Sequence, residues 1–273
     1  MGKERYSMGV RTYKDELTVD INQKGVLDLD TIKGCALGCR NCEKGCWGLC
    51  YAYKIANYRG IDFSKSITRW LKTKSQMKSI GKTIFRSEKE FVRIGTMGDP
   101  CHNWDYTLRI CKWVANSDKP IVIITKHWIE LTDKQMEEFG KLGVIINTSL
   151  SALDTKEQIE YRLKQYERYK KYGKSVLRII SCDFNRENKE GKRLAEIQDE
   201  LFKNDYIIDN PLRVPLNYPM VKSGIIKVKK IMDINSKVYM SKVNPDTYIG
   251  VCKDCPEMCG VNFNYKKNEQ NNR

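Results

Sequence analysis

The chain has 273 residues, enough for one large or two small domains, and its 41% hydrophobic content is enough for a core. No apolar run approaches the roughly 20 residues that a membrane span needs, and the amino-terminal segment lacks the apolar region of a signal peptide, so we expect a cytoplasmic protein without a membrane partner. Lys and Arg number 49 against 34 Asp and Glu, a net charge of +15, which favours a polyanion such as nucleic acid, although a lysine-rich surface also occurs without functional meaning.

The segment GCALGCRNCEKGCWGLCYA (34–52) holds five of the eleven cysteines. They are spaced C-x3-C-x2-C and then C-x3-C, at Cys35, Cys39, Cys42, Cys46 and Cys50. A helix is expected to begin at the CYAYKIAN sequence that follows. Closely spaced thiols in a reducing compartment are more often metal ligands or reactive groups than disulfides. The odd total also argues against a complete disulfide framework.

From residue 63 onward the sequence alternates between helical and strand patterns. The spacing of Ile67, Trp70 and Leu71 predicts an amphipathic helix within 63–80. Further helices are expected over 106–116, after capping boxes at Thr132/Gln135 and Thr155/Gln158, and around Leu194, Ile197 and Leu201. Strands are expected over 91–95, 121–125, 144–150, 175–181 and 206–209, with 212–216 as a candidate continuation of the last.

This alternation predicts an α/β fold with a parallel sheet. The sheet could close as a full or partial barrel, or stay open and doubly wound. No G-x-G-x-x-G follows a strand, so a dinucleotide-binding fold has no specific support. The polar tail over 265–273 is expected to be frayed.

Three more cysteines, Cys252, Cys255 and Cys259, lie in VCKDCPEMCG (251–260) near the end of the chain. Structural zinc needs four tetrahedral Cys or His ligands, and the chain has two histidines, so a zinc site would have to be all-cysteine and remains an alternative. Buried inert thiols suit an isolated residue such as Cys111 better than a cluster. An iron–sulfur cluster is the better account of residues 34–52, because three cysteines leave one iron of a [4Fe–4S] cluster open to another ligand.

The C-x3-C-x2-C spacing at the start of a βα array resembles the cluster loop of the radical S-adenosylmethionine superfamily. The resemblance covers roughly residues 30–217 and is closest to the spore photoproduct lyase-like branch. Four later segments carry it in order: FVRIGTMGDP (91–100), IVIITKHW (121–128), VIINTSLSAL (144–153) and SVLRIISCDFN (175–185). Two features differ, since Asn41 replaces an aromatic residue and "CYA" follows Cys50 instead of Cys42.

The resemblance implies a partial (β/α)6 TIM-type barrel over 1–240, with a cysteine-rich cluster loop near its amino end and a cysteine-rich extension over 241–273. It implies an enzyme whose [4Fe–4S] cluster receives an electron from a donor such as flavodoxin or ferredoxin. The cluster then cleaves S-adenosylmethionine to a 5′-deoxyadenosyl radical, which abstracts hydrogen from the substrate. Whether this makes a lyase or a modifying enzyme is left open.

On this reading Cys35, Cys39 and Cys42 bind the reactive cluster. Contacts with S-adenosylmethionine are expected from the glycine-containing turn and the following strand ends, at Gly95, Thr96, Gly98, Asp99, Lys126, Ser149, Ser151 and Arg178, with Asn185 a weaker candidate. Cys101 and Cys182 lie at strand ends and are candidate hydrogen donors, the alternative being ordinary buried cysteines.

Cys46 and Cys50 are expected to point toward Cys252, Cys255 and Cys259, where a second [4Fe–4S] cluster or zinc would bind. The basic stretches 162–175 and 222–231 contain or adjoin aromatic residues, a combination found in nucleic-acid grooves. DNA or RNA repair or modification is therefore the leading expectation for the substrate. A peptide or small-molecule substrate is one alternative, and a non-catalytic zinc-stabilised nucleic-acid-binding protein is another.

Overall fold

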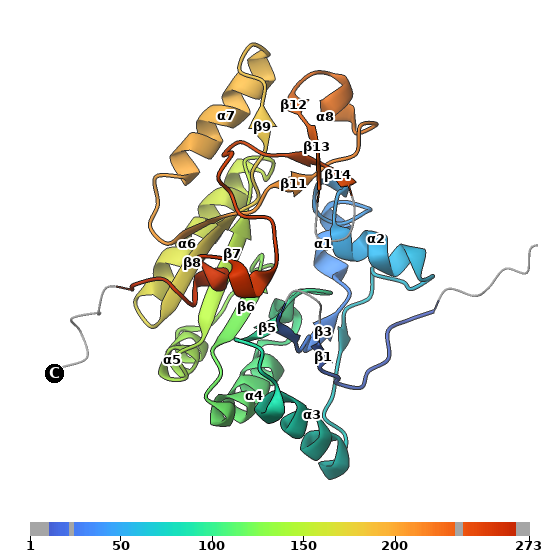
Figure 1. Ribbon diagram of the computed structural model, residues 1–273, viewed down its shortest axis with the longest axis vertical. Coiled ribbons are helices and arrows are strands. Elements are labelled where there is room, and N and C mark those ends of the chain that lie inside the picture. The colour runs from blue at the N-terminus through green and yellow to red at the C-terminus, as the bar shows by residue number, and fades with distance from the viewer. Residues whose placement is uncertain (1–10, 22–24, 233–236, 266–273) are drawn as a thin grey trace, which may run out of the picture.

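A seven-stranded, mainly parallel sheet forms the centre of the computed structural model, which describes residues 11–21, 25–232 and 237–265 (Figure 1). Its strands, in spatial order, are β1 Asp20–Ile21, β2 Leu27–Asp28, β5 Val92–Ile94, β6 Ile121–Thr125, β7 Ile145–Leu150, β8 Lys174–Ile179 and β10 Ile207–Asp209. Only β1 is antiparallel to its neighbour, and the spatial order follows the chain. The expected α/β class with a parallel sheet is confirmed.

Five helices connect or follow these strands: α3 Lys74–Arg86, α4 Trp104–Val114, α5 Asp133–Lys141, α6 Lys156–Lys170 and α7 Lys189–Leu201. Both predicted capping boxes are present, so that α5 begins after Thr132 and α6 after Thr155. Figure 1 shows α4 to α7 along one side of the sheet and the C-terminal segment, in red, crossing the other.

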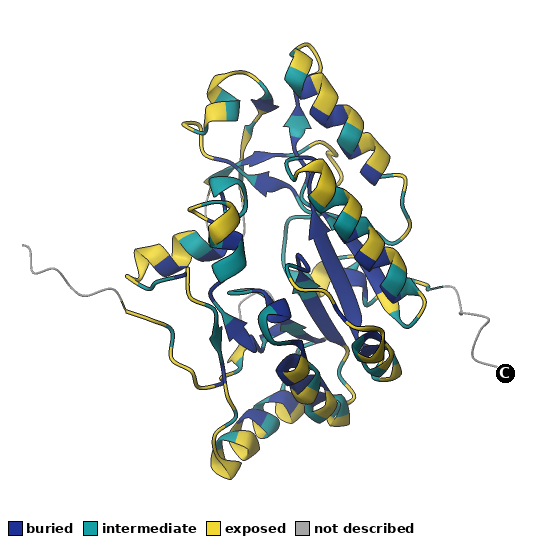
Figure 2. Cartoon of the chain, turned by 180° about the vertical axis from the view of Figure 1, so that it is seen from behind, coloured by how far each residue is buried: buried dark blue, intermediate teal, exposed yellow. Residues whose placement is uncertain are grey.

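The strands are buried on both faces, as Figure 2 shows, and alternate residues serve different cores. Ile121 and Ile123 pack with the core beneath α4 and α5. Val122 points the other way and packs with Met258 of the C-terminal segment. Burial on both faces explains why these strands read as continuous apolar runs and not as alternating ones.

The helix predicted within 63–80 begins later than its hydrophobic spacing suggested. Ile67–Thr68 is a short strand, β4, paired antiparallel with β3 Ile32–Lys33, and α3 starts at Lys74 with Thr73 as its cap. Trp70 exchanges backbone hydrogen bonds with residues 15 and 17. These long-range backbone partners override the local periodicity, and they fix the strand that leads into the cysteine segment.

The cysteine segment forms α1 Ala36–Asn41, the 3-10 turn η1 Cys46–Gly48 and α2 Tyr51–Tyr58. The helix expected at "CYA" is therefore confirmed. Figure 1 places α1 and α2 across from the sheet. Shorter 3-10 turns lie at η2 Pro100–Asn103, η3 Ala115–Ser117, η4 Cys252–Asp254 and η5 Met258–Gly260.

After β10 the chain leaves the main sheet. The expected continuation over 212–216 becomes β11 Leu212–Arg213, which pairs with β14 Lys237–Ser241, itself paired with β13 Lys229–Met232. β9 Asp183–Phe184 pairs with β12 Ile226–Lys227, and α8 is Pro219–Lys222. β14 spans residue 240, where the expected C-terminal extension begins. Within the described ranges, no helix is long and apolar enough to cross a membrane.

Candidate functional site

The glycine-containing turn after β5 is held by a buried carboxylate from the loop after β2. Asp30 is 4% exposed. Its two oxygens accept hydrogen bonds from the backbone N–H groups of Gly95, Thr96 and Met97, at 2.8–3.0 Å, and from the Thr96 hydroxyl at 2.6 Å. Gly95 has φ +101°, and a Cβ there would lie 2.1 Å from the Ile124 carbonyl oxygen. Asp30 therefore fixes the backbone conformation of this turn, and the sequence analysis did not identify this residue.

Replacing Asp30 with Asn should destabilise the fold. An amide nitrogen in place of either oxygen would face two donors and leave a buried backbone N–H without an acceptor. We expect the free energy of unfolding to fall by about 2–3 kcal/mol in urea denaturation. The exposed Glu196→Gln should change it by less than about 0.5 kcal/mol, and an equal loss in both variants would contradict this role for Asp30.

Asp99, at the end of the same turn, is also buried and largely engaged. Oδ1 accepts from the Thr125 hydroxyl at 2.6 Å and from the Cys101 N–H at 3.1 Å, and Oδ2 accepts from the Lys126 N–H at 2.8 Å. A carboxylate oxygen can accept two hydrogen bonds, so Oδ2 keeps capacity for one further donor. Gly98 lies against the start of the cysteine segment, because a Cβ there would be 2.7 Å from the Gly34 carbonyl oxygen.

Lys126 follows β6 and joins a buried ionic network. Its ammonium lies 3.4 Å from Asp154, and Arg162 of α6 pairs with the same carboxylate at 2.6 Å. Asp154 also accepts hydrogen bonds from the Trp47 indole at 2.9 Å and the Ser151 N–H at 2.9 Å. Burial raises the pKa of Asp154, but Lys126 and Arg162 outweigh it and hold the pKa below its usual value. Lys126 thus has a protein carboxylate as its partner.

The same network fastens the cysteine segment to the strand ends. The Lys126 ammonium stands 4.1 Å from the centre of the Trp47 ring, and Arg162 stacks over Trp128 at 4.8 Å. Trp47 has φ +54°, a conformation that this environment maintains. Trp47, Asp154 and Arg162 were missed from the sequence because 107 residues separate the indole from its carboxylate.

The remaining predicted contact residues divide between the site and the core. Ser149 is buried at the carboxyl end of β7. The Ser151 hydroxyl donates to the Ile180 carbonyl at 2.7 Å and so holds the loop after β7. Arg178 lies against Asn147 and the Cys259 sulfur, and Asn185 donates to the Gly224 carbonyl. Of these four, Ser149 is the one whose position suits the predicted contact.

Cys46 is a thiol neighbour of Cys35 and Cys39, and Cys50 and Lys126 are among its own neighbours. Cys35, Cys39 and Cys50 share one apolar cluster with Ala52 and Phe63. Burial raises the pKa of the Cys46 thiol to about 11, against the effect of nearby Lys126. All eleven cysteines lie within the described ranges, and all are unpaired thiols.

Among the residues that the structure describes, no three His, Cys, Asp or Glu side chains converge closely enough to hold one metal ion. A four-iron cluster is several atoms across, so its thiolate ligands stand farther apart than those of a single ion. Thiolates are the groups that hold such clusters in proteins, and a cluster at the cysteine segment stays a prediction.

The C-terminal cysteines lie against the face of the sheet that the final segment crosses. Cys259 packs with Phe91, Val122 and Ile145, which begin β5, β6 and β7 or lie next to their first residues. Its backbone carbonyl accepts from the Asn147 amide at 2.9 Å, its sulfur lies 3.7 Å from Arg178 of β8, and Cys252 lies 3.8 Å from Arg93. Cys46 has other charged neighbours, Lys126 and Asp154, which follow β6 and β7. The expectation that Cys46 and Cys50 point toward the C-terminal cysteines stays a prediction.

Cys101 and Cys182 are core residues in this structure. Cys101 packs with the core under α4, and Cys182 packs beneath α7. Burial raises the pKa of both thiols. The alternative of ordinary buried cysteines therefore has the structural support, while hydrogen donation by either stays a prediction.

His127 is buried next to Lys126 and has one unsatisfied ring nitrogen. Nε2 lies 3.0 Å from the Thr148 hydroxyl, whereas Nδ1 has no hydrogen-bond partner. Burial lowers its pKa to about 4. Since the unfolded chain binds this proton near pH 6.5 and the folded chain near pH 4, stability should fall as the pH drops between those values.

This linkage should cost the wild type about 2–3 kcal/mol of unfolding free energy between pH 7 and pH 4.5. Urea titrations across that range would measure it. The variant His127→Asn removes the titrating group and keeps a residue that tolerates the positive φ of 50°. Its pH dependence should be shallower, and equal slopes in both proteins would assign the linkage to other groups.

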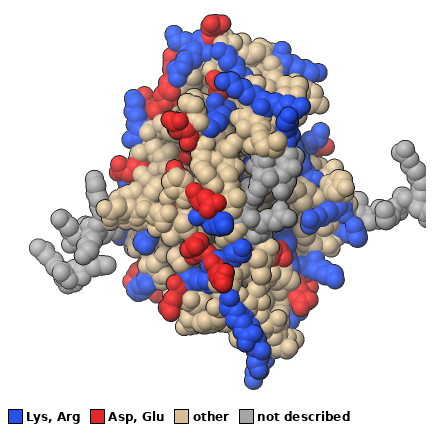
Figure 3. Space-filling model, viewed as in Figure 1, with Lys and Arg blue, Asp and Glu red and all other residues tan. Residues whose placement is uncertain are grey.

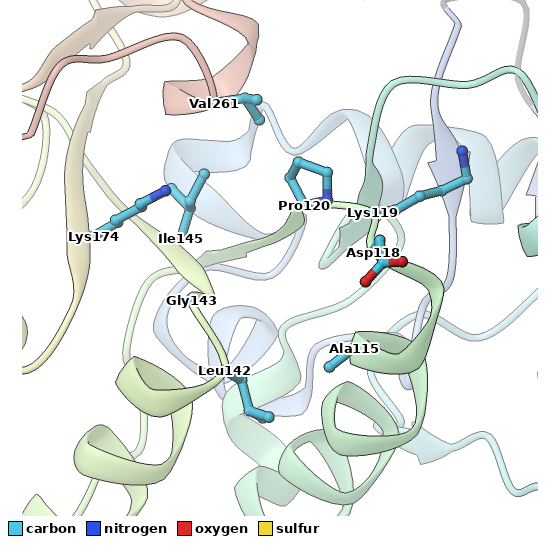
Figure 4. A pocket seen from close by; sticks show the side chains of 9 residues that line it. All are labelled: Ala115, Asp118, Lys119, Pro120, Leu142, Gly143, Ile145, Lys174 and Val261. Atoms are coloured by element: carbon cyan, nitrogen blue, oxygen red, sulfur yellow. The ribbon is translucent and has the colours of Figure 1, made fainter.

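A cavity of about 260 Å³ opens near the amino ends of β6, β7 and β8, away from the cysteine segment (Figure 4). It is lined by Ala115, Asp118, Lys119, Pro120, Leu142, Gly143, Ile145, Lys174 and Val261. Its two lysines are already engaged, because Lys119 donates to the Ser87 and Lys89 carbonyls and Lys174 lies over the Tyr265 ring. We assign no function to this cavity.

The two basic stretches differ in exposure. In 162–175, Tyr166 and Tyr169 are buried against the sheet, so the expected stacking surface is absent from that part of α6. In 222–231, Lys222, Lys227, Lys229 and Lys230 are exposed. Comparison of the chain with family models, with curated proteins and with solved structures gave no match.

Proposed function

We propose that this chain is a radical S-adenosylmethionine enzyme whose reactive cluster binds at the cysteine segment. One observation carries the proposal: the segment is fastened across the carboxyl ends of β5 to β7, with its thiols beside Asp99 and Lys126. The carboxyl ends of parallel strands are where βα folds build active sites. The proposal rests on this placement together with the sequence resemblance.

The order of the sheet supports the partial (β/α)6 barrel that such an enzyme would have. The parallel strands β2, β5, β6, β7, β8 and β10 follow one another in space as in sequence. A doubly wound sheet reverses its order at a switch point, and this one does not. Right-handed crossovers in a constant direction place the helices on one face, and we propose that the other face curves around the reaction site.

The residues around the proposed site position and shield the reactants. Asp30 fixes the turn 95–97, and the Tyr51 hydroxyl after Cys50 donates to the Thr96 carbonyl. Asp99 Oδ2 can accept one more donor, such as an ammonium group. Thiols of the cysteine segment, Cys35 among them, would hold the cluster, and the bound cofactors would supply one-electron reductive cleavage of S-adenosylmethionine and hydrogen abstraction from the substrate, with an external reductant as the source of the electron.

A nucleic-acid substrate is the class that the surface favours. Figure 3 shows Lys and Arg side chains predominating over the upper end of the molecule, where α7 and α8 lie. Lys222, Lys227 and Lys229 are exposed there, and Tyr218 at the start of α8 donates to the Trp47 carbonyl at 2.9 Å. This hydrogen bond joins the start of α8 to the cysteine segment. Phosphate contacts of this kind give strongly salt-dependent binding.

Anaerobic reconstitution tests the chemistry. We expect a brown protein that, once reduced with dithionite, converts S-adenosylmethionine to methionine and 5′-deoxyadenosine. A fully loaded cluster that yields no 5′-deoxyadenosine would overturn the proposal. A colourless protein that retains zinc would instead support the non-catalytic nucleic-acid-binding protein.

Binding to labelled single- and double-stranded oligonucleotides tests the substrate class. The affinity should fall steeply between 50 and 200 mM salt if several lysines contact phosphates, by about tenfold or more. The double variant Lys227→Ala/Lys229→Ala should weaken binding, whereas Lys134→Ala, an exposed lysine on α5, should not. Salt-independent binding or none would favour a peptide or small-molecule substrate.

A further inference from the structure

We infer that the three protein ligands of the cluster are Cys35, Cys46 and Cys50, in place of the Cys35, Cys39 and Cys42 that spacing alone favours. The inference rests on the proposed function, since it concerns which thiols hold the proposed cluster. It also changes the interpretation of the residues between Cys42 and Cys50. The spacing suggests an insertion with ligands for a second metal site, whereas the inference makes these residues part of the loop that binds the reactive cluster.

The first argument is that Cys46 is held in place by three contacts of its neighbour Trp47. The Trp47 indole donates to Asp154, the Lys126 ammonium lies over the ring, and the Tyr218 hydroxyl donates to the Trp47 carbonyl. The left-handed backbone of Trp47 fixes the direction of the chain next to Cys46. A ligand that must meet a cluster in one geometry needs a support of this kind.

The second argument is that the backbone brings Cys50 and Cys35 toward Cys46. Gly45 allows the approach of Cys50, because a Cβ at Gly45 would lie 2.6 Å from the Cys50 Cβ. Gly38 makes room for the Cys35 sulfur in the same way, at 2.8 Å. Cys35 and Cys50 also share one apolar cluster with Cys39 and with Met97 of the turn after β5. Cys46 and Cys50 are the thiols that act electrostatically on Cys35, and this proximity groups the three thiols.

The third argument is the identity of the charged neighbours. Cys46 and Cys50 lie near Lys126, and Cys35 lies near Asp99. Both neighbours belong to the carboxyl ends of the strands, where a cofactor between loop and sheet must sit.

Cys39 and Cys42 have partly different neighbours. Cys39 has Cys46, Asp62 and Cys42 as its charged or thiol neighbours, and Asp62 follows α2. The Cys42 sulfur lies 3.9 Å from where a Cβ of Gly48 would be, and Tyr218 is among its neighbours. The contrast with Cys35, Cys46 and Cys50 is that the charged residue next to Cys39 is Asp62, and not Asp99 or Lys126 at the strand ends.

Single Ala variants of all five cysteines, reconstituted anaerobically, test the assignment. The readouts are iron and sulfide per chain and the EPR spectrum of the reduced cluster with and without S-adenosylmethionine. The part of the EPR signal that changes on adding S-adenosylmethionine should be at least tenfold weaker in Cys35→Ala, Cys46→Ala and Cys50→Ala than in the wild type. The matched variants Cys39→Ala and Cys42→Ala should keep more than half of it.

Alkylation of the loaded wild-type protein gives a readout that no folding defect can affect. With iodoacetamide and mass spectrometry, Cys39 and Cys42 should be modified while Cys46 and Cys50 are protected until the cluster is removed. Loss of the signal in Cys42→Ala but not in Cys46→Ala, or protection of Cys42 but not of Cys46, would overturn this inference alone. A wild-type protein that takes up no iron would overturn the proposed function itself.

Discussion

Replacing Asp154 with Ala should lower the free energy of unfolding by about 3–5 kcal/mol. The carboxylate is 3% exposed and lies between the Lys126 ammonium and the Arg162 guanidinium. Without it, two positive charges stay buried with no counter-charge, and the cost of desolvating them is no longer offset. Urea denaturation followed by circular dichroism would measure the loss.

Two controls separate this effect from a general loss of contacts. Glu200→Ala removes an exposed ion pair with Lys203 and should cost less than about 1 kcal/mol. In the double variant Asp154→Ala/Lys126→Met one of the uncompensated charges is gone, so part of the stability should return. An Asp154→Ala protein as stable as Glu200→Ala would show that the network is solvated and contributes little.

The signals that predicted the fold correctly act over a few residues. The capping boxes at Thr132 and Thr155 bond within one turn, so they locate the starts of α5 and α6 in any tertiary setting. The run 121–125 is a strand because every residue in it is apolar or β-branched and both faces are covered. These features are readable from sequence because the partners that decide them are near in the chain or uniformly apolar.

The features that escaped prediction depend on partners far along the chain. Ile67 has helical spacing but pairs with Lys33 in a strand. Asp30 shows no motif, yet it holds a turn 65 residues away. In the cysteine segment the spacing predicts that thiols gather, and it cannot predict their directions, because those depend on how Trp47 meets Asp154.

Replacing Cys35 with Ala should reduce the formation of 5′-deoxyadenosine by at least 100-fold, the largest effect on activity that we expect. Cys35 belongs to both possible ligand sets, so the result does not depend on which other thiols bind. It is also the cysteine that β3 and the turn after β5 place directly, since Gly34 donates to the Met97 carbonyl at 2.9 Å and Cys35 donates to the Phe63 carbonyl at 2.8 Å.

Cys111→Ala is the control for the loss of a buried thiol. Cys111 is fully buried in the core under α4, so the variant should lose some stability, about 1–2 kcal/mol, and keep its activity per folded molecule. Iron content shows why Cys35→Ala loses activity. If Cys35 holds the proposed cluster, iron per chain and 5′-deoxyadenosine should fall together. A Cys35→Ala protein with full product formation would mean that Cys35 is not a ligand of the reactive cluster, which would contradict both possible ligand sets.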